Sequence, residues 1–258
     1  MAILDDVTPL LITYNEIENI ERTLAKLDWA RRIVVVDSGS SDGTLAFLKS
    51  DSRIEIFHRA FTSFAEQCNY GLSLIGSEWV LSMDADYELG SELIDGLREL
   101  TPSASDAGFR ANFVYRVFGR PLRGTLYPPR IVLYRVRGAQ YENQGHGHRV
   151  RVPGSISSLR GVIYHDDRKP LSRWFASQLR YGPIEASHLL EANPGELSFN
   201  DRVRRRGWMA PVLVFVYVLI VKRALLDGRA GIYYAFQRLL AELVISLEIL
   251  DRRLSRLR

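Results

Sequence analysis

Short apolar runs alternate with helical patterns through the first hundred residues, and this alternation is the feature that most constrains the fold. The runs at 9–13, 33–36 and 79–83 are mostly apolar, as expected for strands that are buried on both faces. Between these runs, residues 17–27 and 63–75 carry apolar side chains at helical spacing. Strands and helices that alternate in this way predict an α/β fold, with a mainly parallel sheet and helices on both of its faces.

Polar or acidic clusters follow three of the predicted strands. The clusters are Thr-Tyr-Asn-Glu at 13–16, Asp-Ser-Gly-Ser at 37–40 and Asp-Ala-Asp at 84–86. Because the carboxyl ends of parallel strands meet at one edge of a sheet, we expect the three clusters to lie close together and to form the ligand-binding edge.

Asp84 and Asp86 form the sharpest candidate site. At a strand end, residues two positions apart point the same way, and two carboxylates on one face suit Mg²⁺ or Mn²⁺. Such a metal would offset the charge that develops on a departing nucleoside diphosphate. Two unrelated acids in a solvated loop are the alternative, and the position directly after an apolar strand favours the metal site.

Taken in order, the segments 11–16, 34–44 and 81–86 resemble family 2 glycosyltransferases. The resemblance is strong over residues 7–90, and the ordered set of three motifs is far more specific than any one of them. It implies an inverting enzyme with the GT-A fold, which is a Rossmann-like fold of nucleotide-diphospho-sugar transferases.

Two later segments are similar to the bacterial lipopolysaccharide-core group of this family. They read His-Asp-Asp-Arg-Lys-Pro-Leu at 165–171 and Leu-Asp-Gly-Arg-Ala-Gly at 226–231. This similarity implies that a sugar moves from a nucleotide-diphosphate donor to a glycolipid or polysaccharide acceptor of the cell envelope. It also implies a C-terminal helical segment close to the membrane.

The resemblance carries over to single residues. In the first cluster the acid and the backbone would contact the nucleoside, and Asp37 would hold its base or ribose. Asp84 and Asp86 would bind the metal and the donor, and His165 matches the histidine that completes the metal site in many enzymes with the GT-A fold. Taken alone, Asp37 could instead cap a turn, and His165 could be structural. The residues of the first cluster concerned are Thr13, Asn15 and Glu16.

The sequence departs from the family at the catalytic base. Related enzymes usually supply Glu or Asp there, whereas the corresponding loop at 144–149 reads Gln-Gly-His-Gly-His-Arg. Residues 144–148 are predicted to form a flexible loop. Histidine has an unperturbed pKa near ~6.5 and can accept a proton at neutral pH. We therefore predict that His148 or His146 is the base, with Asp86 in the same catalytic centre; histidines that only line the acceptor cleft are the alternative. The reserve candidates for the base are Glu142, Asp166 and Asp167.

Two arginines are candidates for binding anions. Arg130 begins a predicted strand at 130–136, and Arg149 directly follows the histidines. A guanidinium group matches phosphate and carboxylate oxygens through paired hydrogen bonds, so we expect Arg130 to bind the donor diphosphate and Arg149 to bind it or an anionic acceptor. Ordinary surface charges are the alternative for both.

The last quarter of the chain is its basic part. The whole chain has a net charge of +4, yet residues 201–258 hold 12 Lys and Arg against five Asp and Glu. The fourteen uncharged residues 208–221 also lie here, a run that is shorter than the ~20 residues of a membrane span. We expect residues 1–200 to be the catalytic domain and residues 201–258 to be a helical region that binds an anionic membrane surface. A soluble domain that buries 208–221 in its core is the alternative.

Features of the whole chain bear on its location. The first ten residues lack a basic start followed by an apolar run, so we do not expect a secretory signal. Cys68 is the only cysteine, which excludes an internal disulfide and fits a reducing compartment. We therefore expect the protein at the cytoplasmic face of the inner membrane, either peripheral or embedded in the interface.

Two rival functions share parts of this pattern. A nucleotidyltransferase also holds a metal with carboxylates on an α/β sheet, but it favours a glycine-rich basic loop after the first strand, and residues 11–19 contain no glycine. A catalytically inactive, membrane-bound scaffold with the GT-A fold would explain the missing loop carboxylate. A nucleic-acid partner is not expected, because the basic tail lacks zinc-finger spacing, an RNA-binding aromatic motif and a basic heptad region.

Overall fold

The computed structural model describes residues 3–144, 147–195 and 197–256. The chain divides into two compact units. One, here called the sheet unit, comprises Met1–Arg116 and Tyr127–Arg168, and the other, the helical unit, comprises Val117–Leu126 and Lys169–Arg258. This division differs from the boundary expected between residues 200 and 201, because the first long helix after the sheet packs with the C-terminal helices. Which segments catalysis requires stays a prediction.

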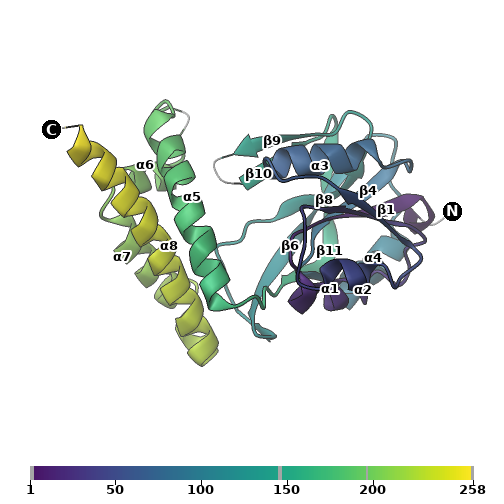
Figure 1. The fold of residues 1–258 in the computed structure, drawn as a ribbon, viewed down its shortest axis with the longest axis horizontal. Coiled ribbons are helices and arrows are strands. Elements are labelled where there is room, and N and C mark those ends of the chain that lie inside the picture. Colours follow the sequence, from purple (N-terminus) through teal and green to yellow (C-terminus); the bar gives the residue numbers. More distant parts are fainter. Residues whose placement is uncertain (1–2, 145–146, 196, 257–258) are drawn as a thin grey trace. The chain divides into compact units, whose positions relative to one another are not determined.

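In the described residues, the main sheet has nine strands in the order β3-β2-β1-β4-β8-β6-β11-β5, with β7 paired to β6 (Figure 1). Neighbouring strands run parallel from β3 to β4, and β8 lies antiparallel between β4 and β6. The predicted α/β class with a mainly parallel sheet is confirmed. The strands are β1 (Val7–Thr13), β2 (Ile33–Asp37), β3 (Ile54–His58), β4 (Trp79–Asp84), β5 (Tyr87–Leu89), β6 (Asp106–Val117), β7 (Arg120–Pro121), β8 (Arg130–Arg135) and β11 (Ser155–His165).

Helices cover both faces of this sheet, which agrees with the mostly apolar sequences of β1, β2 and β4. Alternate residues of β1 point to opposite faces: Leu11 packs with α1 (Ile17–Leu24), α2 (Thr44–Leu48) and α4 (Ser91–Glu99). Leu10 packs with α3 (Phe64–Ser73) on the other face. Figure 1 shows α3 on one side of the sheet and α1, α2 and α4 on the opposite side.

A second, two-stranded sheet packs beside α3. Its strands β9 (Gln140–Gln144) and β10 (Gly147–Arg151) are antiparallel, and His148 lies opposite Asn143. The expectation of a flexible loop over 144–148 is therefore wrong for His148, which lies on a strand because Tyr141 and Val150 are buried against α3 and anchor the hairpin. His146 lies outside the described residues.

The strand register brings the three polar clusters to one edge of the sheet. Thr13 is the partner of Asp37 across β1 and β2. Ile12 is the partner of Asp84 across β1 and β4. The predicted convergence at the carboxyl ends of the parallel strands is confirmed.

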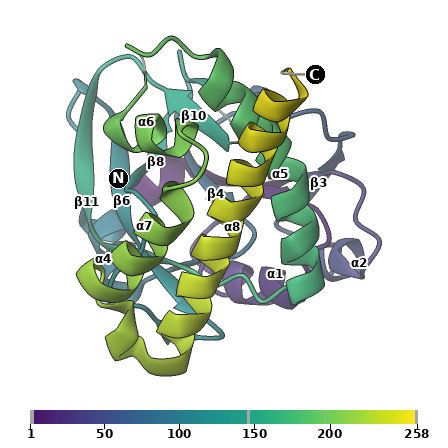
Figure 2. The same cartoon turned by 90° about the vertical axis from the view of Figure 1, so that its left-hand side faces the viewer.

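The helical unit is built around its longest helix, α8. Figure 2 shows α5 and α7 alongside it, and the core between the helices includes Leu189 and Ile249. Arg204 is largely buried and forms ion pairs of 2.9 Å with Glu185 and 3.0 Å with Glu242. The helices are α5 (Leu171–Glu191), α6 (Phe199–Arg205), α7 (Ala210–Val216), the π-helical turn η2 (Tyr217–Val221), the 3-10 turn η3 (Ala224–Asp227) and α8 (Gly228–Ser255).

The apolar run at 208–221 packs in part against α8. Ala210 and Val218 are buried, and the ring of Phe215 lies 5.4 Å from that of Phe236 on α8. Only one side of the run is covered. Among the described residues, no helix is both long enough and apolar enough to cross a membrane. The large apolar side chains left exposed along α7, η2 and η3 include Trp208, Val212, Val216, Ile220, Val221, Leu225 and Leu226.

Candidate active site

Two loops at the ligand-binding edge are joined by hydrogen bonds between side chains of one and the backbone of the other. The backbone N–H of Asn15 donates to Ser40 Oγ at 2.7 Å, and that of Glu16 donates to Thr44 Oγ1 at 2.7 Å. In return, Asn15 Oδ1 accepts from the N–H of Ser41 at 2.6 Å. Asn15 has a φ of 55°, a left-handed conformation that asparagine tolerates better than most residues. The first and second motifs therefore form one structural unit.

Asp37 organises the second of these loops. It is fully buried, and its Oδ1 accepts from the N–H groups of Gly39 and Ser40 at 2.8 Å. Its Oδ2 accepts from the hydroxyl groups of Thr13 at 3.0 Å and Ser40 at 2.5 Å. These four hydrogen bonds hold the loop in shape, and the direct contact of Asp37 with a nucleoside stays a prediction.

The acidic pair and the predicted histidine lie together. Asp84 ends β4 and is half-buried, and Asp86 is 8% exposed. His165 ends β11 opposite Tyr87 on β5, and its Nε2 lies 3.1 Å from Asp86 Oδ2. The N–H of Asp166 also donates to the backbone oxygen of Asp86 at 3.2 Å. Strand pairing thus brings residues 165–166 into contact with Asp86, next to Asp84.

Three tyrosine rings surround the imidazole of His165. The ring centroids of Tyr115, Tyr127 and Tyr87 lie 4.8, 5.0 and 5.2 Å from it. Burial disfavours the charged imidazole, but the carboxylate of Asp86, with help from other nearby acids, outweighs this effect, and the pKa of His165 is raised. His165 therefore presents a basic imidazole beside the acidic pair.

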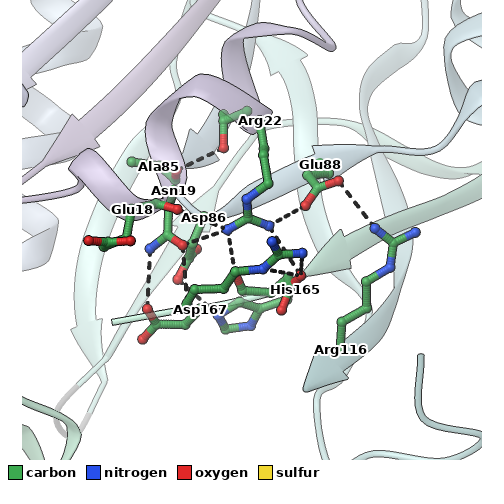
Figure 3. A network of polar contacts seen from close by, with 12 residues as sticks. Glu18, Asn19, Arg22, Ala85, Asp86, Glu88, Arg116, His165 and Asp167 are labelled. Atoms are coloured by element: carbon green, nitrogen blue, oxygen red, sulfur yellow. Dashed lines mark hydrogen bonds and ion pairs between the residues drawn. The ribbon is translucent and has the colours of Figure 1, made fainter. Parts of the chain in front are cut away.

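A partly buried polar network lies next to the acidic pair, with Arg22 at its centre (Figure 3). The guanidinium group of Arg22 donates to Glu88 Oε1 at 2.5 Å, to Asp166 Oδ2 at 3.1 Å and to Asn19 Oδ1 at 2.6 Å. Glu88 also pairs with Arg116 at 3.2 Å. The sequence reasoning missed this network, because each residue in it is an ordinary charged residue until the fold brings its partners near.

The reserve candidates for the base are placed differently. Asp166 is fully buried, and its carboxylate is engaged by Arg22 and Arg168. Asp167 accepts a hydrogen bond from Asn19 Nδ2 at 3.2 Å. Glu142 is exposed on β9 and pairs with Arg151 at 2.6 Å.

His148 lies on β10 in partly buried, aromatic surroundings. Its ring centroid is 5.3 Å from that of Tyr141 and 5.5 Å from that of Phe64. Burial lowers the pKa of His148, the charge of Arg130 lowers it further, and the carboxylate of Asp84 opposes both only in part. The imidazole is therefore neutral near pH 7 and able to accept a proton.

The two candidate anion-binding arginines differ in setting. Arg130 is half-buried, and its guanidinium carbon lies 4.7 Å from the ring centroid of Tyr127. Burial disfavours the charge of Arg130, but Tyr127, Tyr87 and Asp84 outweigh it and raise its pKa. Arg149 is exposed on β10. Arg130 thus presents a fixed positive charge near the acidic pair, and Arg149 is the more solvated of the two.

Comparison with known proteins decides the family. The model of Glycosyl transferase family 2 matches residues 10–148, which is more than half of the chain. The chain belongs to this family. Membership makes it a glycosyltransferase, confirms the predicted GT-A type of fold, and takes the place of the nucleotidyltransferase alternative.

Relatives of this family 2 glycosyltransferase include a named enzyme of lipopolysaccharide synthesis. The lipopolysaccharide core biosynthesis glycosyltransferase LpsC of Rhizobium meliloti (strain 1021) is 26% identical over 200 residues, with 72% of each chain covered. An uncharacterised glycosyltransferase of Rickettsia prowazekii (strain Madrid E) is 22% identical over 253 residues, which cover 91% of this chain and 84% of the relative. The predicted similarity to the lipopolysaccharide-core group is confirmed by the match to LpsC.

A solved structure is similar over nearly the whole chain. It is the crystal structure of S. aureus TarS 1–349 in complex with UDP-GlcNAc, which is 13% identical, with 96% of this chain and 92% of that chain covered and a TM-score of 0.49.

The predicted metal ligands fit a hard divalent ion by their chemistry. Asp84 and Asp86 supply carboxylate oxygens, which Mg²⁺ and Mn²⁺ prefer, and His165 supplies an imidazole 3.1 Å from Asp86. Within the part of the chain that the structure describes, no three His, Cys, Asp or Glu side chains are already arranged around a common metal position. The family 2 glycosyltransferase therefore has suitable donor atoms in place, and their convergence on a metal stays a prediction.

Proposed function

We propose that this glycosyltransferase moves a sugar from a nucleoside-diphosphate donor to a glycolipid or saccharide of the cell envelope, with inversion at the anomeric carbon. The observation that carries the proposal is the placement of Asp84, Asp86, His165 and Arg130 around the edge where the first two motifs end. The relationship to LpsC supports an envelope acceptor.

The first two motifs would bind the nucleoside. Their loops are held by mutual hydrogen bonds through Asn15, Ser40 and Thr44, so little conformational entropy is lost when a ligand binds. The candidate contacts are Thr13, Asn15, Glu16 and Asp37.

The diphosphate would lie next to Asp84 and Asp86. Mg²⁺ or Mn²⁺ held by these carboxylates, with His165 nearby, would supply positive charge to the departing diphosphate. Arg130 adds a fixed positive charge near the acidic pair, because it interacts electrostatically with both Asp84 and His148. Preorganised charges of this kind act where negative charge develops in the transition state.

His148 would act as the base. Its lowered pKa keeps the imidazole neutral at pH 7, so it can take the proton of the acceptor hydroxyl as the oxygen attacks the anomeric carbon. Attack from the side opposite the leaving diphosphate inverts the configuration at that carbon. His146 remains a second candidate.

The helical unit would attach the enzyme to the cytoplasmic face of the inner membrane. The exposed apolar side chains at 208–226 lie in a segment with the exposed cations Arg206 and Arg223, and Arg229 follows. Apolar side chains enter the interface while arginines contact anionic headgroups. Arg204, which lies in the same basic region, instead pairs with Glu185 and Glu242. Such attachment would bring a lipid-linked acceptor close to the enzyme.

A donor panel tests the proposed reaction. The full chain is incubated with UDP-, GDP- and dTDP-sugars and Mn²⁺, and nucleoside-diphosphate release is measured with and without lipid-linked saccharide acceptors. For the donor that is used, NMR of the product gives the anomeric configuration, and we expect it to be inverted. A product with retained configuration contradicts the mechanism, and no release from any donor supports the inactive scaffold.

A further inference from the structure

A side chain on α3 binds the backbone of the hairpin that carries His148. Asn69 lies on α3, and its amide group contacts both backbone polar groups of Tyr141 on β9. Its Nδ2 donates to the carbonyl oxygen of Tyr141 at 3.0 Å, and its Oδ1 accepts from the N–H of Tyr141 at 2.8 Å. One planar amide thus supplies the donor and the acceptor that a neighbouring strand would otherwise supply.

The hairpin depends on contacts of this kind because it is small. In the described residues β9 and β10 form a sheet of two strands, so one edge of β9 has no partner strand there. A two-stranded hairpin is marginally stable by itself and needs packing against another element. Figure 1 shows the hairpin beside α3. Asn69 binds the open edge of β9 and joins it to this helix.

Tyr141 connects this attachment to His148. The side chain of Tyr141 is buried. Its hydroxyl group accepts from the hydroxyl of Tyr134 on β8 at 2.8 Å and donates to Ser82 Oγ on β4 at 2.9 Å. Its ring centroid lies 5.3 Å from that of His148. Tyr141 is therefore held at its backbone by Asn69 and at its hydroxyl by two strands of the main sheet, while its ring contacts the imidazole.

The helix also supplies a direct neighbour of the imidazole. Phe64 is the first residue of α3, and its ring centroid lies 5.5 Å from that of His148. His148 is two residues from Val150, which is the cross-strand partner of Tyr141. The aromatic contacts of His148 therefore come from α3 and from β9, the two elements that Asn69 joins. A hairpin that moved away from α3 would change the position of the imidazole relative to Phe64.

We propose that Asn69 is a positioning residue: by binding the backbone of Tyr141 it holds the β9–β10 hairpin on α3 and fixes the imidazole of His148 for catalysis. A base must lie within hydrogen-bond reach of the hydroxyl that it deprotonates, so a displaced imidazole loses rate. The inference rests on the proposed function for the role of His148 as base. Its structural part, that Asn69 controls the position of the hairpin, does not depend on any substrate.

Amide hydrogen exchange of the full chain without ligand tests the structural part. Asn69→Ala removes both hydrogen bonds, and Asn69→Asp keeps an oxygen for the N–H of Tyr141 but has no donor for its carbonyl oxygen. We expect peptides from β9 and β10 to exchange about tenfold faster in Asn69→Ala, with a smaller increase in Asn69→Asp. Unchanged exchange in these peptides overturns the proposal. If Asn69→Ala does not fold, Asn69→Asp takes its place, and the same two outcomes decide.

Ser77 provides the control for a loss of stability elsewhere in the sheet unit. Its Oγ lies 2.8 Å from Thr8 Oγ1 and 2.9 Å from the backbone oxygen of Trp79. This position is at the amino end of β4, whereas the candidate site lies at the carboxyl end. Ser77→Ala should leave exchange in the hairpin as in the wild type. If it accelerates this exchange as much as Asn69→Ala does, the effect is a general loss of stability and the proposal is overturned.

The pKa of His148 gives a second measurement that needs no substrate. Burial lowers this pKa, so a hairpin that moves off α3 should expose the imidazole and raise its pKa toward the ordinary value of ~6.5. NMR follows the titration, and the spectrum of His148→Gln identifies the signal. We expect a higher pKa in Asn69→Ala and the wild-type value in Ser77→Ala. An unchanged pKa in Asn69→Ala overturns the proposal.

Turnover of the donor identified by the panel tests the catalytic part. In Asn69→Ala we expect kcat to fall about tenfold with little change in the KM for the donor, because the proposed base moves and the donor site does not. Ser77→Ala should match the wild type. An unchanged kcat in Asn69→Ala, when His148→Gln is inactive, overturns the positioning role. If His148→Gln is itself active, the proposed function is wrong about the base, and hydrogen exchange and NMR still decide the structural part.

Discussion

The Nε2 atom of His165 lies 3.1 Å from Oδ2 of Asp86, although 79 residues separate them in the chain. The contact forms because β11 pairs with β5, which directly follows the acidic pair. The contact is between the imidazole of His165, whose pKa is raised, and the carboxylate of Asp86, which is largely buried. The candidate metal site therefore depends on the pairing of β5 with β11, which brings His165 next to Asp86.

The role of His148 as base predicts a pH dependence. The folded-state pKa of His148 is lowered from its ordinary value of ~6.5. The imidazole is therefore still mostly neutral at pH ~6.5, and kcat/KM should fall only when the pH approaches the lowered pKa. Replacing His148 by Gln should lower kcat by ~10²–10⁴-fold and remove this acidic limb, with little change in donor binding. The measurement is a pH profile of kcat and kcat/KM.

The exposed His188 on α5 is the matched control for His148. His188→Gln should leave the pH profile as in the wild type, and His146→Gln is measured alongside. Activity within a few-fold of wild type for both His148→Gln and His146→Gln would move the role to Glu142, Asp166 or Asp167.

Asp37 should contribute to both stability and nucleotide binding. Asp37→Ala removes the acceptor of four hydrogen bonds. We expect a loss of about 2–3 kcal/mol in the free energy of unfolding. Urea unfolding measures this loss. The affinity for free UDP or GDP, measured well below the melting temperature, should also fall, and an unchanged affinity in the folded variant would make Asp37 a turn residue only.

Arg22 should be far more important for stability than an exposed arginine. Arg22→Ala would remove one ion-pair partner from Asp166, which keeps Arg168, and one from Glu88, which keeps Arg116. This loss should cost about 2–3 kcal/mol. Arg98 pairs with Asp95 on the exposed side of α4, so Arg98→Ala should cost less than about 1 kcal/mol. Urea unfolding of both variants gives the comparison, and equal losses would show that the network adds no stability.

Membrane binding should depend on the exposed apolar side chains of α7 and η2. The double variant Val212→Glu and Ile220→Glu changes two residues that are 63% and 67% exposed, so the fold should tolerate it. We expect the wild type to float with vesicles that contain anionic phospholipid, less so at 1 M salt, and the double variant to stay in the soluble fraction.

Leu179 on α5 is 65% exposed and is the control for this surface. Leu179→Glu should still float with the anionic vesicles. A wild-type protein that stays monodisperse and unbound without detergent contradicts the proposed location.

The strand ends of the donor site could be predicted from the sequence because their signal is local. β1, β2 and β4 are buried on both faces, so each is a mostly apolar run, and the polar residue that ends it is visible in the sequence. The ordered motifs then identified the family over the same stretch. For this reason Asp37, Asp84 and Asp86 were placed at the correct edge without coordinates.

Other parts of the site depend on pairings between distant residues. The hairpin that holds His148 exists because Tyr141 and Val150 pack on α3, and its short glycine-containing sequence resembles a loop. The partners of Arg22 lie 66 and 144 residues away. A single sequence contains no signal for such pairs, so the network around Arg22 could be found only in the structure.

Metal-dependent binding of nucleoside diphosphate tests the central claim most directly. The melting temperature of the full chain is measured with UDP or GDP in Mn²⁺ and in EDTA, for the wild type, for Asp86→Asn, and for Asp95→Asn as a control on an exposed acid. We predict that nucleotide stabilises the wild type and Asp95→Asn in Mn²⁺ only, and that Asp86→Asn loses this stabilisation. Equal stabilisation in Mn²⁺ and EDTA, or full stabilisation of Asp86→Asn, would contradict the assignment of Asp84 and Asp86 as the metal site.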